Sequence, residues 1–115
     1  MSRDKLFLIQ PGFEDPAHPG QFFVCPDCNA IEGLLASFPL LAASLEVERV
    51  PFSRPRRAVA ELLGDAHQSL PVLVFAGDDG GPSDAESANG RRFVSSPTRI
   101  LELLAKRNGF PRLHR

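Results

Sequence analysis

The apolar run LPVLVFAG, residues 70–77, constrains the fold of this chain more than any other segment. Five apolar residues follow Pro71 and Gly77 ends the run, which is the pattern of a buried strand. Because these apolar residues do not alternate with polar ones, we expect both faces of the strand to be buried, as in a central strand covered by helices. The sequence therefore predicts a layered α/β domain built around this strand.

Three further segments predict strands. Residues 5–9, KLFLI, form a short apolar run that Pro11 interrupts. Residues 45–52, LEVERVPF, alternate apolar and charged side chains with a period of two, which is typical of a half-exposed strand. Residues 91–95, RRFVS, predict a short edge strand. We therefore expect a sheet of four strands.

A helical pattern lies between the first two of these strands. Apolar residues recur at i, i+3, i+4 and i+7 from Ile31 to Phe38, which forms one stripe along a helix. Pro39 should break or kink this helix, because proline lacks an N–H and its ring clashes with the preceding turn. Ser37 is the expected cap of a brief second helical stretch, PLLAASL.

Proline and glycine mark the predicted boundaries of the other two helices. Pro55 is expected to open a helix that Gly64 stops. The last helix has the clearest boundaries, with Ser96 as its N-cap, Pro97 as its first residue and Gly109 as its stop.

The predicted element order is β-α-β-α-β-β-α, in an α/β domain with a central mixed four-stranded sheet flanked by helices. We expect a single domain over residues 1–115. Residues 11–24 and 77–91 are rich in proline, glycine or polar residues and are expected to be loop insertions.

Charge and hydropathy narrow the classes of function. Thirteen Lys and Arg against fourteen Asp and Glu give a net charge of −1, whereas binding to nucleic acid or an anionic membrane needs a basic surplus. The start of the chain has too few apolar residues before Pro11 for a signal-peptide core, and nothing later approaches a membrane span. We therefore expect no nucleic-acid partner, no membrane partner and a cytoplasmic location.

Cys25 and Cys28, in the motif CPDC, stand at the start of the first helical pattern. The thiolate is the reactive form of cysteine, and a helix N-terminus stabilises an anion through its unpaired N–H groups. Cys25 is therefore the expected nucleophile, and Cys28, one turn deeper, is placed to resolve a mixed disulfide. Asp27 opposes this activation through like-charge repulsion.

Three motifs together resemble those of the thioredoxin-like superfamily. They are CPDC at a helix start, SLPVLV with Pro71 at the head of the third strand, and VSSPTRI at the start of the last helix. The chain is closest in its CPxC form to glutaredoxins and is similar to a functionally uncharacterised bacterial branch of the superfamily. One difference is the connection between the first strand and Cys25, which is long at about fifteen residues.

The resemblance implies a thiol-disulfide oxidoreductase with a redox-active cysteine pair. It implies that Pro26 belongs to the active motif and that a cis bond joins Leu70 to Pro71, leaving the Leu70 backbone free to pair with a substrate. The expected substrates are disulfides of proteins or of low molecular weight.

The resemblance also implies glutathione as a candidate co-substrate, and no resident cofactor is expected. Arg56 and Gln68 are the candidates for holding its glycyl carboxylate, since arginine grips a carboxylate through two hydrogen bonds. The cluster of Arg54, Arg56 and Arg57 is explained at least as well as a solvated basic face. Ser95 and Ser96 are the candidates for its γ-glutamyl end, although Ser96 is equally explained as a helix cap.

Two other classes of protein stay open on the sequence. In the first, the chain keeps the fold as a binding or interaction module, and its cysteines are buried and inert. In the second, the two cysteines bind a metal. Zinc needs about four ligands, which His18 and His67 would complete, and an iron–sulfur cluster shared by two chains is a more remote form of the same idea.

Overall fold

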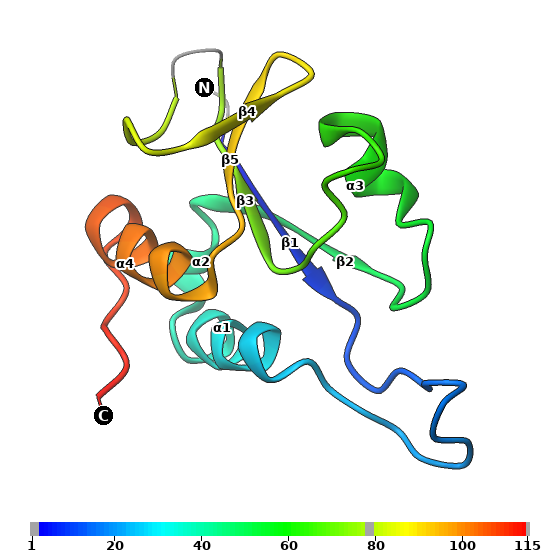
Figure 1. Cartoon of the computed structure of the whole chain (residues 1–115). Helices are drawn as coiled ribbons and strands as arrows, with labels where there is room; N and C mark the ends of the chain where they lie inside the picture. Colours follow the sequence, from blue (N-terminus) through cyan, green and yellow to red (C-terminus); the bar gives the residue numbers. More distant parts are fainter. Residues whose placement is uncertain (1–2, 78–79, 115) are drawn as a thin grey trace.

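A five-stranded mixed sheet forms the centre of the structure, a computed structural model that describes residues 3–77 and 80–114 (Figure 1). The strands lie in the order β2-β1-β3-β5-β4. The pair β1–β2 is parallel and every other pair is antiparallel. The strands are β1 Asp4–Ile9, β2 Leu45–Val50, β3 Val72–Val74, β4 Glu86–Ala88 and β5 Arg91–Val94.

In the described residues, four helices cover the sheet, and they are divided unequally between its two faces (Figure 1). Three of them pack on one face, over a core cluster that contains Leu6, Leu8 and Leu73. The helix α3 packs on the other face, over a second cluster that contains Phe7, Val72 and Val74. The helices are α1 Pro26–Ser37, α2 Pro39–Ala42, α3 Arg57–Leu63 and α4 Pro97–Asn108.

The central strand β3 is buried on both faces, as its uninterrupted apolar sequence predicts. Leu73 and Phe75 belong to the core cluster beneath α1 and α4, and Val72 and Val74 belong to the cluster beneath α3. Because side chains alternate across a strand, one short run supplies both layers of the core. The chain therefore has the layered α/β architecture expected from residues 70–77.

The last helix begins and ends where its sequence indicates. The hydroxyl of Ser96 accepts a hydrogen bond from the backbone N–H of Arg99 at 3.4 Å, so Ser96 is the N-cap. Gly109 closes the helix in the left-handed conformation at φ 80°, which glycine adopts without steric cost. Gly64 ends α3, also as expected.

The expectation of four strands is wrong. Residues 86–88 lie within the segment 77–91 expected to be a loop, but they form β4 and pair with β5. Consequently β5 is an inner strand between β3 and β4, and it is not an edge strand. The sequence gives little sign of β4, because Glu86–Ala88 has no apolar alternation. The strand pairs with β5, and Ala88 packs against the core cluster that contains Phe93. Asp78 and Asp79 of the expected loop lie outside the described residues.

Three expectations about helix ends are also wrong. Pro55 does not open α3, which begins at Arg57, and the Arg54–Pro55 bond is cis. Ser37 does not cap α2, because Phe38 is its N-cap residue and no side chain caps it. Phe38 itself stands past the end of α1 and is 38% exposed, so it does not extend the buried stripe.

Residues 11–24 connect β1 to α1 as a loop that doubles back on itself. Phe13 and Phe23 form an isolated antiparallel bridge, with the N–H of Phe23 donating to the carbonyl of Phe13 at 2.8 Å. The ring of Phe13 stacks on Phe52 with 4.3 Å between centroids, so the loop is attached to the segment after β2. In the described part of the chain, no helix is long and apolar enough to cross a membrane.

We predict that two leucine-to-alanine substitutions differ sharply in their effect on stability. Leu104 is fully buried and Leu40 is 90% exposed, although both lie on helices. Leu104→Ala should lower the free energy of unfolding by about 2–5 kcal/mol through lost burial and a residual cavity. Leu40→Ala should change it by less than about 0.5 kcal/mol.

Urea unfolding followed by far-UV circular dichroism tests this pair, since the chain has no Trp or Tyr to report by fluorescence. Equal effects of the two substitutions would contradict the packing of α4 described here.

Candidate active site

The sequence-predicted site residues gather at one end of the sheet. In the antiparallel registers Phe7 pairs with Val72 and Leu73 pairs with Val94. The end of β1, the start of β3 and the end of β5 therefore lie side by side. We call this the CPDC end of the sheet and define it by Ile9, Pro71 and Ser95.

Cys25 stands at the N-terminus of α1, where the sequence predicts it. It is the N-cap residue of the helix, and its Sγ accepts a hydrogen bond from the backbone N–H of Cys28 at 3.3 Å. The helix N-terminus and this donor both present positive partial charge to the sulfur. Cys25 is half-buried and its thiol is free, whereas Cys28 is buried.

Cys28 lies one turn further along α1 and is only 2% exposed. The backbone N–H of Ile9 donates to its Sγ at 3.4 Å, which attaches α1 to the end of β1. Burial raises the pKa of the Cys28 thiol to about 12; the N–H of Ile9 opposes this rise, while Cys25 and Asp27 add to it. The two thiols of one motif are therefore unequal, because one caps the helix at the surface and the other is buried as a neutral group.

Exposed apolar side chains lead up to Cys25. Phe22 is 75% exposed and Val24 is 47% exposed, and both belong to the segment that enters α1. A partner that approaches Cys25 along this segment meets apolar surface before it reaches the sulfur.

Pro71 is placed at the head of β3, and the Leu70–Pro71 bond is cis as expected. Leu70 is partly buried and packs against both core clusters. Pro26 is the first residue of α1, where its missing N–H costs no helical hydrogen bond.

Arg56 and Gln68 do lie together, but they are buried and bonded to each other. They are 7% and 8% exposed. The backbone N–H of Arg56 donates to Oε1 of Gln68 at 2.7 Å, and its Nη1 donates to the Gln68 carbonyl at 2.9 Å. Their capacity to hold a carboxylate stays a prediction, and in the structure they join the start of α3 to the segment before β3.

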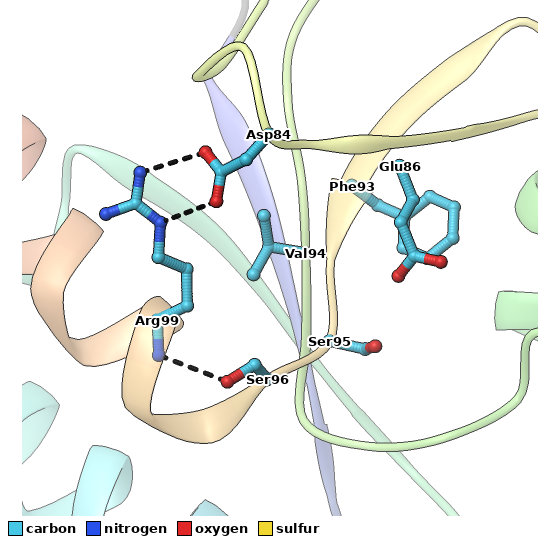
Figure 2. Close-up of a pocket in the computed structure, with 7 residues that line it drawn as sticks. All are labelled: Asp84, Glu86, Phe93, Val94, Ser95, Ser96 and Arg99. Atoms are coloured by element: carbon cyan, nitrogen blue, oxygen red, sulfur yellow. Dashed lines mark hydrogen bonds and ion pairs between the residues drawn. The ribbon is translucent and has the colours of Figure 1, made fainter.

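Ser95 and Ser96 line a surface cavity of about 430 Å³ beside the N-terminus of α4 (Figure 2). Figure 2 shows the Ser96 hydroxyl directed at the Arg99 N–H while the Ser95 side chain points the other way. Arg99 forms a two-pronged pair with Asp84, at 3.1 and 3.0 Å, and this pairing lowers the pKa of Asp84. The carboxylate of Glu86 also lines the cavity.

The two histidines considered as metal ligands lie against aromatic rings. His18 lies 5.9 Å from the ring of Phe23, and His67 lies 5.0 Å from the ring of Phe93. Within residues 3–77 and 80–114, no three His, Cys, Asp or Glu side chains are grouped in a way that could hold a metal ion.

Two features of the site could not be found in the sequence. The Ile9 contact to Cys28 is made by a backbone N–H, which leaves no side-chain signal. The pair Asp84–Arg99 joins the segment before β4 to α4, and only the fold brings these two residues together.

The fold and the site thus define an α/β protein with a pair of unequal thiols at a helix N-terminus. Residues 3–112 match the family model described as protein of unknown function (DUF3088), so the chain belongs to the DUF3088 family. No curated protein and no solved structure matches it significantly.

We predict that iodoacetamide alkylates Cys25 at least about a hundredfold faster than Cys28 at pH 7, because Cys28 is buried and its pKa is raised to about 12, whereas Cys25 is only half-buried. Peptide mass spectrometry of timed samples measures both rates. Cys28→Ser should keep the fast reaction, and Cys25→Ser should react slowly until urea unfolds it. Slow and equal labelling of the two thiols would overturn the asymmetry and support inert cysteines.

The raised pKa of Cys28 also predicts a loss of stability in alkaline solution. The unfolded thiol titrates near 9.0 and the folded one near 12, so between these values the folded chain holds more protons than the unfolded chain. The free energy of unfolding therefore falls as pH rises through this window. Between pH 8 and pH 10, the free energy of unfolding of the wild type should fall by about 1 kcal/mol more than that of Cys28→Ala.

Urea titrations at the two pH values measure this difference. Because both proteins carry the same other titrating groups, parallel losses in wild type and Cys28→Ala would show that Cys28 is not held as a neutral thiol.

Proposed function

We propose that this DUF3088 chain is a thiol-disulfide oxidoreductase of thioredoxin-like fold that acts through Cys25 and Cys28. The observation that carries the proposal is the asymmetry of the two thiols. Cys25 caps α1, accepts a hydrogen bond from an N–H and is half-buried, whereas Cys28 is buried with its pKa raised to about 12. Disulfide exchange needs one thiol that attacks the substrate at neutral pH and a second, nearby thiol that resolves the mixed disulfide.

The first step is attack by the Cys25 thiolate on one sulfur of a substrate disulfide. The substrate S–S bond breaks, a mixed disulfide forms between Cys25 and that sulfur, and the other substrate sulfur leaves with the electron pair and takes a proton from solvent. The N–H of Cys28 and the end of α1 favour the attacking anion.

The second step belongs to Cys28. Its sulfur loses its proton to solvent and attacks Sγ of Cys25, which forms the Cys25–Cys28 disulfide. The bond between Cys25 and the substrate sulfur breaks, and that sulfur leaves with the electron pair and takes a proton from solvent. Overall the substrate disulfide gains two electrons and two protons, and the protein dithiol loses them. The high pKa of Cys28 keeps it from competing for the substrate in the first step.

The arrangement of the sheet supports the thioredoxin-like part of the proposal. The order β1-α1-β2-α3-β3-β5-α4 follows the predicted β-α-β-α-β-β-α, with α2 and β4 as additions. The cis Leu70–Pro71 bond begins β3 at the CPDC end of the sheet, the end to which Ile9 attaches Cys28.

The surroundings of Cys25 favour a polypeptide disulfide over glutathione as substrate. Phe22 and Val24, just before Cys25 in the chain, are exposed apolar side chains that a polypeptide substrate can contact. Glutathione carries two carboxylates, and the cavity at Ser95 and Ser96 is lined by two further carboxylates with Arg99 already paired. Like charges at that cavity oppose an anionic ligand.

The experiment is disulfide trapping with two substrates, oxidised glutathione and a short neutral peptide with one intermolecular disulfide. With Cys28→Ser, the first step should stop at a mixed disulfide on Cys25, which intact-protein mass spectrometry detects, and the peptide adduct should form at least several-fold faster than the glutathione adduct. Wild type should proceed to the internal disulfide with loss of two hydrogens.

Cys25→Ser is the matched control and should form no adduct with either substrate. If Cys28→Ser and Cys25→Ser gave equal adducts, or if neither reacted, the chain would not be an exchange protein, and the reading as a binding module with inert cysteines would replace it.

A further inference from the structure

A cavity of about 370 Å³ lies between the start of the loop 11–24 and the segment that follows β2. Pro11 and Phe13 line it from the loop, and Pro51 and Phe52 line it from the other segment. The rings of Phe13 and Phe52 are stacked, with 4.3 Å between centroids and 3° between planes, so they join the two walls. Two prolines and two phenylalanines thus give this cavity, which we call the loop pocket, apolar walls.

The loop itself connects the pocket to Cys25. In Figure 1 it runs out from the end of β1 and returns to the start of α1. Phe13 bridges Phe23, whose N–H donates to the Phe13 carbonyl at 2.8 Å. Phe23 stands two residues before Cys25, a stretch of chain that spans at most about 7 Å. Phe13 and Cys25 also pack against the same core cluster. One wall of the pocket is therefore held within a few residues of the N-cap thiol.

The sheet connects the pocket to Cys28. Gln10 lines the pocket and directly follows Ile9, whose N–H donates to Sγ of Cys28 at 3.4 Å. The pocket therefore lies at the CPDC end of the sheet, where β1 ends. A polypeptide whose cysteine bonds to Cys25 can place a neighbouring side chain in it.

The charges at the pocket restrict what it can hold. Arg49 lines it, but this guanidinium is paired with Glu32 at 2.6 Å. Glu14 also lines it, is exposed, and belongs to none of the ion pairs formed within residues 3–77 and 80–114. The uncompensated carboxylate opposes an acidic side chain, whereas the apolar walls favour a large apolar one.

We propose that the loop pocket binds a large apolar side chain that flanks the reactive cysteine of the substrate. The inference rests on the proposed function and deepens it, because it names the class of substrate as polypeptide disulfides with apolar, non-acidic residues beside the cysteine. Phenylalanine is the most informative probe, since its ring can pack against the rings of Phe13 and Phe52. The long connection between β1 and Cys25 then has a function, because it supplies one wall of the pocket.

The experiment measures how fast three symmetric peptide disulfides form a mixed disulfide with Cys25 in the Cys28→Ser background. The peptides differ only in the two residues that flank their cysteine, which are both phenylalanine, both alanine or both glutamate. Intact-protein mass spectrometry of timed samples gives each rate. Each rate is divided by the rate at which N-acetylcysteine attacks the same disulfide, which removes the intrinsic reactivity of the peptide.

The phenylalanine peptide should react at least about fivefold faster than the alanine peptide, and the glutamate peptide at least about threefold slower. Ser53 lines the pocket and is exposed, so Ser53→Phe adds bulk there without disturbing the core, and it should reduce the phenylalanine preference to within about twofold. The matched control Ser37→Phe changes an exposed serine at the far end of α1 and should keep the preference.

Glu14→Gln should make the glutamate peptide react about threefold faster and leave the other two peptides unchanged. Its control Glu61→Gln removes an exposed charge from α3 and should change none of the three rates. Equal normalised rates for the three peptides, or a phenylalanine preference that survives Ser53→Phe, would overturn the proposal.

A second measurement needs no disulfide exchange. Peptides with serine in place of cysteine should, at millimolar concentration, slow the alkylation of Cys25 by iodoacetamide when phenylalanine flanks the serine, but not when alanine does. If no disulfide reacts while the phenylalanine peptide protects Cys25, the proposed function is refuted and the pocket stands. If the disulfides react at equal normalised rates and neither serine peptide protects Cys25, the pocket is refuted and the proposed function stands.

Discussion

The contact between the start of α1 and the end of β1 organises the rest of the site. The Ile9 N–H donates to Cys28, and the Cys28 N–H donates to Cys25, so one short chain of hydrogen bonds fixes both sulfurs relative to the sheet. Since β3 is antiparallel to β1 and to β5, Pro71 and Ser95 also lie at this end of the sheet. The position of the thiols thus follows from strand order and from the burial of one sulfur.

The parts of the structure that depend on local sequence were predictable. The uninterrupted apolar composition of residues 72–76 predicts that both faces of this strand are buried. Ser96 and Gly109 predict the ends of α4, because helix capping depends on side chains and backbone angles within a few residues. The CPDC motif indicated a helix start for the same reason. In each case the signal and its structural effect lie within one turn or one strand.

The parts that depend on partners distant in sequence were not predictable. Glu86–Ala88 becomes a strand because β5 offers it a free edge, and Arg56 is buried because Gln68 and the Phe52 carbonyl surround it. From the sequence alone, a cluster of arginines indicates either a solvated surface or a ligand-binding surface. Only tertiary packing distinguishes the buried Arg56 from its exposed neighbour Arg57.

The long connection between β1 and Cys25 packs against Phe52, the residue whose carbonyl binds the guanidinium of Arg56. The loop folds back at the Phe13–Phe23 bridge and stacks Phe13 on Phe52. Phe52 in turn holds the guanidinium of Arg56 with its carbonyl and lies beneath it with its ring. The loop therefore supports the buried Arg56 through Phe52, and it also carries the exposed Phe22 and Val24, which precede Cys25 in the chain. A shorter connection would lack the aromatic stack that supports Phe52, and with it the packing that keeps an unpaired arginine buried.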